Sequence, residues 1–245
     1  MPHSSIYRKT MEIIVIAKQV QMVDSVKCDF AGVEGAIRLK RKTDANIKVV
    51  VMGKEKDAVA QVRDAISMGA DSGVVLAIDD DNYDSWTVAV GFCEYLKNQS
   101  YDVIMSGSFP IDADTIQTGL LTGNMLGLTS VSHIEDVETG EKNNALVLKK
   151  RMEDRVQLYE VKTPCMLSTL PHPEAPIYKT VPGINKAYST DIPVIYLDLK
   201  AQKGKIIVAD SFKIGERKRG KCLTAISTEG AVKEIIGTIS TNHIL

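Results

Sequence analysis

Four short apolar runs that lack alternating polar residues place the strongest constraint on the fold of this chain. They are MEIIVIA at residues 11–17, IKVVVMG at 47–53, GVVLA at 73–77 and YDVIMSG at 101–107. Strands of this composition are buried on both faces, which is typical of parallel sheets. Stretches with helical spacing separate the runs. We therefore predict an α/β fold with a mainly parallel, doubly wound sheet.

The remaining elements are expected in two groups. The connecting helices should lie at residues 33–42, 54–68, 85–98 and 112–126. Strand-like pieces follow at 130–138, 144–152, 155–162 and 164–171, and they either add antiparallel strands to the sheet or form a ribbon beside it. Residues 170–193 are rich in proline and poor in periodicity, which predicts a long loop that reaches toward a partner. A last helix is expected at 229–239.

Composition excludes several classes of function. Thirty basic and thirty-one acidic side chains leave a formal net charge of −1, so no overall field attracts nucleic acid or an anionic membrane. The apolar runs are shorter than the ~18 residues that span a bilayer. Four widely spaced cysteines predict buried thiols in a reducing compartment, and we expect the cytoplasm. No metal-binding spacing, catalytic triad or nucleophile elbow is recognisable, so we predict neither a metal site nor a catalytic residue.

The junction between the fourth apolar run and the next helix is the best candidate for a binding site. Ligands of doubly wound sheets bind beyond the carboxyl ends of the strands, where helix N-termini offer free N–H groups to an anion. Asp112 or Asp114 can cap the helix, and neutral hydrogen bonds are available from Ser108, Thr115, Gln117 and Thr118. Neither G-x-G-x-x-G nor a P-loop is present. The pattern alone leaves open an anion site or an ordinary capped turn.

Several stretches resemble the β subunit of electron-transfer flavoproteins. MEIIVIAKQV is similar to the family's opening strand, with Lys18 at its basic position, and AISMGADSGVVL is similar to its Gly-Ala-Asp turn. GSFPIDADTIQTGLLTGNMLG resembles the Ile-Asp-x-Asp-x-x-Gln-x-Gly signature, which starts a nucleotide-binding helix. RMEDRVQLYEVKTPCMLST resembles the following strand pair, and APIYKTVPGINKA resembles the recognition loop. The tail is similar to the branch tied to nitrogen fixation and carnitine pathways.

The resemblance implies the electron-carrying β subunit of a heterodimer rather than an enzyme. An α subunit would hold or share FAD, a flavin dehydrogenase would donate electrons, and a downstream acceptor would receive them. The resemblance also implies AMP, or a second FAD, in this chain's own cleft. The contacts would fall on Ile16, Met52, Gly107, Ser108, Phe109, Asp112, Ala113, Asp114, Ile116, Gln117 and Thr118. Docking of the donor would use Pro173, Pro176, Tyr178, Pro182 and Ile184.

The implied organisation has three parts. These are an N-terminal extension at 1–10, a nucleotide-binding α/β domain at 11–190 with a recognition loop at 171–187, and a C-terminal arm with a terminal helix at 191–245. Two features depart from the family: residues 19–30 shorten the excursion after the first strand, and Pro173 stands nearest the loop's usual leucine anchor. Two alternatives stay open. One is an adenine-nucleotide-binding module of the universal-stress type, and the other is a degenerate subunit that binds no nucleotide.

Overall fold

The computed structural model describes most of the first two hundred residues and parts of the tail. The described residues are 10–21, 26–28, 30–79, 83–108, 115–140, 144–171, 177–199, 204, 220, 222, 224 and 227–241. The chain divides into two compact units, Met1–Ile207 and Val208–Leu245. In the second unit the described helix is α6 (Thr228–Thr241), which buries none of its own side chains.

The first unit alternates strands and helices and then adds a group of strands. In chain order the elements are β1 (Met11–Gln21), β2 (Val26–Cys28), α1 (Ala31–Lys42), β3 (Ala45–Gly53), α2 (Glu55–Met68), β4 (Ser72–Ala77), α3 (Ser85–Leu96), β5 (Val103–Gly107), α4 (Thr115–Met125), β6 (Thr129–Thr139), β7 (Ala145–Arg151), β8 (Val156–Lys162), β9 (Cys165–Thr169), α5 (Val181–Ser189) and β10 (Val194–Tyr196).

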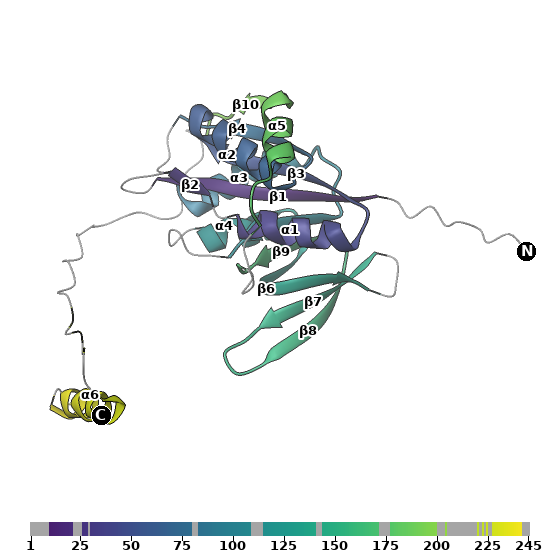
Figure 1. Cartoon of the computed structure of the whole chain (residues 1–245). Helices are drawn as coiled ribbons and strands as arrows, with labels where there is room; N and C mark the ends of the chain where they lie inside the picture. Colours follow the sequence, from purple (N-terminus) through teal and green to yellow (C-terminus); the bar gives the residue numbers. More distant parts are fainter. Residues whose placement is uncertain are drawn as a thin grey trace, which may run out of the picture. The chain divides into compact units, whose positions relative to one another are not determined.

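One sheet organises this unit (Figure 1). Among the described residues it has the strand order β10-β4-β3-β1-β5-β9-β6-β7-β8, with β2 beside the end of β1. Every neighbouring pair from β10 to β6 is parallel, whereas β7 and β8 are antiparallel to their neighbours. The prediction of a mainly parallel, doubly wound sheet with added antiparallel strands is confirmed.

Helices cover both faces of the sheet, and the central strands supply the core. Ile13 and Val15 of β1 pack with α1 and α2, whereas Ile14 and Ile16 point to the opposite face and pack with α3. Figure 1 shows α1 and α5 nearer the viewer, on either side of β1, with α3 and α4 fainter and farther back. Full burial of an aliphatic side chain contributes about 1.5–3 kcal/mol, so the alternation along β1 stabilises both layers.

The prediction of a long loop at 170–193 is wrong for Val181–Ser189, which form α5. The Thr180 side chain accepts a hydrogen bond from the Gly183 N–H at 3.1 Å, which caps the helix. Arg63 of α2 donates to the Ala187 carbonyl at 2.6 Å, and Ala187 is the buried residue of α5. A side chain at Gly183 would bring its Cβ to 2.3 Å from the Ser67 carbonyl oxygen. Docking onto α2 rather than apolar periodicity therefore stabilises this helix.

The strands β6–β9 are not arranged in the sheet in the order in which they occur along the chain. β9 lies between β5 and β6 and is parallel to both, so only β7 and β8 form the antiparallel ribbon at the edge. At the opposite edge, β10 pairs in parallel with β4. The segment expected as the start of the C-terminal arm thus begins with a strand of the sheet.

Two of the four cysteines are buried as expected. Burial raises the pKa of the Cys93 thiol to about 11 and that of the Cys165 thiol to about 12, so both stay protonated and unreactive near neutral pH. Cys222 is exposed, which contradicts the expectation for that residue. The Cys28 side chain lies outside the described residues. No helix in the described part of the chain is long and apolar enough to cross a bilayer.

Asp71 ties three elements together at the amino ends of the strands. Its carboxylate accepts hydrogen bonds from Lys40 of α1 at 2.5 Å and from the Ile47 N–H of β3 at 2.8 Å, and Lys186 of α5 lies 3.6 Å away. Burial acts to raise the pKa of this carboxyl. The hydrogen bonds from Lys40 and Ile47 and the charges of Lys40 and Lys186 outweigh it and hold the pKa below its usual value.

We predict that Asp71→Asn lowers the free energy of unfolding by about 1–2 kcal/mol near neutral pH. Because the folded-state pKa is depressed, this contribution is present above the unfolded value of 3.8 and is lost as the pH falls through the folded value. Urea unfolding at about pH 7 and about pH 3 should show the gap between parent and variant closing in acid. Asp64→Asn, which breaks an exposed pair with Lys179, is the control and should cost less than ~0.5 kcal/mol.

Candidate functional site

The topology places a crevice between β1 and β5. From β1 the chain passes through α1, β3, α2 and β4 along one side of the sheet, with both helices on the same face. Helix α3 then crosses the opposite face and returns the chain to β5, on the other side of β1. The carboxyl ends of β1 and β5 therefore form a topological switch point, where ligands of doubly wound sheets bind.

A pocket lies at this switch point, on the face that α3 and α4 cover. Ile14 of β1 pairs with Ile104 of β5, and both belong to the core on that face. Because strand side chains alternate, Lys18 and Ser106 farther along these strands point to the same face. The pocket is lined by Ile16, Ala17, Lys18, Phe92, Ser106, Gly107, Thr118 and Gly119.

Three of the eight residues that line this pocket are polar and buried: Lys18, Ser106 and Thr118. Lys18 is 9% exposed, and its ammonium group donates a hydrogen bond to the Tyr83 carbonyl at 3.3 Å. Ser106 is 5% exposed, and its hydroxyl has no hydrogen-bond partner among the described residues. Leaving a buried hydroxyl without a partner costs about 1–3 kcal/mol.

Glycines let the helices approach β5 at Ser106 from both faces. A Cβ atom at Gly32 of α1 would lie 2.9 Å from the Ser106 backbone carbon. On the other face, a Cβ at Gly119 of α4 would lie 2.2 Å from the Ser106 Oγ. Gly123, one turn later in α4, packs in the same way against Met166 of β9, with a virtual Cβ 2.7 Å from the Met166 Cβ. The first turns of α4 are therefore held against the end of β5.

The structure places some of the predicted nucleotide contacts at the pocket. Gly107 and Thr118 line it, as does Ile16. The Ile16 and Met52 side chains both belong to the core, and Met52 is not among the residues that line the pocket. Gln117 is exposed at the start of α4, 3.5 Å from the Ser85 hydroxyl. Outside the description lie Phe109, Asp112, Ala113 and Asp114, together with the side chain of Ile116.

Ser108 is engaged with the sheet rather than directed at the pocket. Its N–H donates to the Thr169 carbonyl at 2.8 Å, and its hydroxyl lies 2.5 Å from the Ser168 hydroxyl. Ser168 also donates to the Gly107 carbonyl at 3.2 Å. These contacts fix the end of β5 against β9. The sequence analysis named Ser108 as a ligand group and did not assign that role to Lys18 or Ser106, although strand alternation would have placed both on one face.

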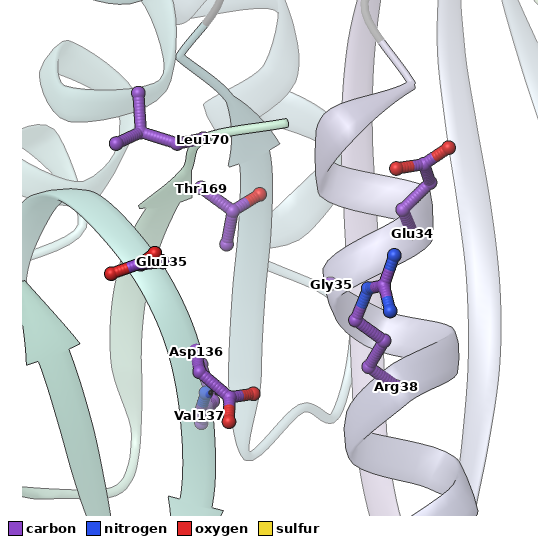
Figure 2. A pocket seen from close by; sticks show the side chains of 8 residues that line it. All are labelled: Glu34, Gly35, Arg38, Glu135, Asp136, Val137, Thr169 and Leu170. Atoms are coloured by element: carbon purple, nitrogen blue, oxygen red, sulfur yellow. Dashed lines mark hydrogen bonds between the residues drawn. The ribbon is translucent and has the colours of Figure 1, made fainter. Parts of the chain in front are cut away.

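Two other hollows have the wrong charge for a phosphate. The first lies between α1 and the strands β6 and β9, where Figure 2 shows Glu34 and Arg38 facing Asp136 and Val137. Its lining includes three carboxylates and one guanidinium. Asp136 accepts a hydrogen bond from Lys42 at 2.9 Å, and the Glu34 carboxylate accepts one from the Ile177 N–H at 3.2 Å. These two hydrogen bonds connect α1 to β6 and to the segment that precedes α5.

The second hollow, of about 340 Å³, opens beyond β4 and β10. Its acidic side chains are Glu55, Asp79 and Asp198, so it also repels anions. Among the described residues, no group of three or more His, Cys, Asp or Glu side chains is arranged to hold a metal ion.

The strand order and the crevice define the class of doubly wound α/β proteins that bind ligands beyond their strand ends. The sequence profile described as "Electron transfer flavoprotein domain" matches residues 15–199, most of the first unit. The chain therefore belongs to the electron transfer flavoprotein family.

Relatives of this chain carry matching names. Electron transfer flavoprotein subunit beta of Thermoanaerobacterium thermosaccharolyticum is 26% identical over 96% of this chain and 94% of its own length. Caffeyl-CoA reductase-Etf complex subunit CarD of Acetobacterium woodii is 24% identical over 96% of this chain and 100% of its own length. Protein FixA of Azotobacter vinelandii is 33% identical over 58% of this chain and 52% of its own length. The prediction of the electron-transfer flavoprotein β-subunit family is confirmed, and several relatives are named as electron-transfer subunits.

We predict that Gly119→Ala lowers the free energy of unfolding by about 1–3 kcal/mol, because the added methyl group overlaps Ser106 and forces α4 away from β5. Urea unfolding measures the loss. Gly237→Ala in α6 is the control, since nothing lies within 4 Å of its added Cβ. That variant should not destabilise the protein, and a Gly119 variant as stable as the parent would contradict the close packing.

Proposed function

We propose that this chain is the β subunit of a heterodimeric electron-transfer flavoprotein and holds an adenine nucleotide, AMP or a second FAD, in the crevice between β1 and β5. The observation that carries the proposal is the buried charge of Lys18 at the switch point. Lys18 lines a pocket that has no acidic residue in its lining, and α4 begins beside it. These groups fit the phosphate of a nucleotide.

The chain's own residues would bind and position cofactors. FAD, held by or shared with the α subunit, supplies the redox chemistry when it is bound. Transfer of electrons between cofactors requires short distances and a tuned environment, not acid or base groups. The pocket at the base of the crevice is small, about 10 Å³, and Phe92 in its lining is fully buried.

An edge ribbon supports a protein partner. Leu158 of β8 is 72% exposed, and Val156 and Tyr159 on the same strand are also exposed. Strand β8 pairs only with β7 in the described part of the chain, so its outer edge offers backbone donors and acceptors. Exposed apolar edge strands invite pairing with another chain. We assign this ribbon to the α-subunit interface.

Helix α5 supports docking of the electron donor. Tyr178 is 74% exposed just before the helix, and Pro182 and Ile184 within it are also exposed. Val181 and Tyr188, which the sequence analysis did not single out, add two further exposed apolar side chains. Pro173 and Pro176 lie outside the described residues. We assign this surface to a flavin dehydrogenase, and we place the complex in a reducing compartment, the cytoplasm, on the basis of the buried free thiols of Cys93 and Cys165.

The nucleotide is tested by its release. We predict that denaturing the purified chain liberates about one AMP or FAD per chain, detected by chromatography of the supernatant. Gln117→Ala, at an exposed position of the signature, should lower the retained amount without changing the melting temperature of the nucleotide-free chain. Retention equal to the parent would remove Gln117 from the site. The absence of both nucleotides from the parent would favour a degenerate subunit.

The partner is tested by co-expression with the flavoprotein α subunit of the same organism. We predict a yellow complex of equal subunit amounts, isolated by gel filtration. Leu158→Asp should reduce its yield at least about tenfold, because a charge would be buried in an apolar contact. Tyr178→Asp, on the surface assigned to the donor, should leave the yellow complex intact. A colourless monomeric parent would overturn the heterodimer, and full yield with Leu158→Asp would exclude the ribbon from its interface.

A further inference from the structure

The outer face of the β7–β8 ribbon carries cations beside its exposed apolar side chains. Leu148 of β7 is buried in the core that the ribbon shares with α1, and strand alternation turns Lys149 and Arg151 to the opposite face. In the antiparallel register, Lys149 lies opposite Leu158 and Arg151 lies opposite Val156. Directly opposite residues share a face, so each cation stands beside one exposed apolar side chain.

Both cations bind the same carboxylate. Glu135 of β6 accepts a hydrogen bond from the Arg151 guanidinium, and its second oxygen, Oε2, lies 3.4 Å from Lys149 Nζ. The Glu135 side chain is 6% exposed, whereas those of Arg151 and Lys149 are 55% and 45% exposed. The hydrogen bond from Arg151 holds the pKa of the Glu135 carboxyl below its usual value, so the group is ionised near neutral pH. A covered carboxylate thus restricts two side chains that lose much rotamer freedom when they are held.

The arrangement leaves donors for a second acceptor. A guanidinium group has five N–H donors in a planar fork, and an ammonium group has three. The described contacts of Arg151 and Lys149 both end on Glu135, and two cations with one carboxylate leave one net positive charge beside the exposed apolar pair. Farther along the same face, the charges of Lys162 and Glu160 offset each other. This part of the ribbon therefore fits an acidic partner surface.

We propose that Arg151 and Lys149, positioned by Glu135, bind a carboxylate of the α subunit beside the apolar contact made by Leu158. The inference rests on the proposed function, which assigns the ribbon to the α subunit, and deepens it by naming the charge that the partner carries. Side chains that are already held lose less entropy on binding, and charge-assisted hydrogen bonds are stronger than neutral ones. Glu135 is a positioning residue, because it acts through the two cations.

The rate of subunit exchange tests the two cations. The yellow complex with the α subunit of the same organism is mixed with excess affinity-tagged parent chain at about 50 mM and about 500 mM NaCl. Arg151→Met should raise the exchange rate about tenfold at low salt and reduce its dependence on salt, and Lys149→Met should raise the rate about threefold. Arg151→Lys, which keeps the charge, should retain the salt dependence. Arg155→Met, which breaks an exposed pair with Asp154 on the same ribbon, is the matched control and should exchange like the parent.

Glu135→Gln separates positioning from charge. The substitution makes the face more positive, so an effect through charge alone would slow the exchange. A positioning role predicts exchange about threefold faster, because the two cations are no longer held. The melting temperature of each free chain reports on folding, and Lys149→Met, which leaves the hydrogen bond between Arg151 and Glu135 in place, keeps the test decisive where Arg151→Met is unstable.

The outcomes distinguish this inference from the proposed function. Exchange rates equal to the parent in Arg151→Met and Lys149→Met, at both salt concentrations, would overturn the carboxylate contact and leave the heterodimer standing. Slower exchange in Glu135→Gln would overturn the positioning role of Glu135. A parent chain that forms no yellow complex would overturn the proposed function itself.

Discussion

Burial of β1 on both faces is the constraint on which the rest of the structure depends. Its alternating apolar side chains need a helix layer on each side, and parallel neighbours reach it only through crossover connections. Helices α1 and α2 cover one face, and α3 returns across the other. That reversal separates the carboxyl ends of β1 and β5. The crevice is therefore a consequence of how the central strand is covered.

Polar groups lie at the crevice because the apolar pattern of each strand ends in a polar residue. Ile14 and Ile16 of β1 are followed on the same face by Lys18, and Ile104 of β5 is followed by Ser106. Each polar residue is buried because the layers extend past the last apolar position. Close contacts at Gly32 and Gly119 then hold the helices against β5. Small residues at these points permit an approach that any larger side chain would prevent.

Most strands and helices of the first half were predictable, because each is long enough for its hydrophobic pattern to be recognised in the sequence. The second half was less so. Helix α5 was missed because a single residue, Ala187, is buried in it, and its stability comes from the cap at Thr180 and the contacts with Arg63 and Ser67. The place of β9 between β5 and β6 was missed because strand order depends on contacts between distant segments.

The sequence by itself determined the alternation of buried strands and helices, the junction at which β5 leads into α4, and the membership of the electron transfer flavoprotein family. These properties lie in local periodicity and in contiguous motifs. The tertiary structure decided which groups meet at that junction. It turned Ser108 toward β9, and it brought Lys18 from β1 and Ser106 from β5 to one pocket. Pairing of residues ninety positions apart is set by packing of the whole core, which no local pattern records.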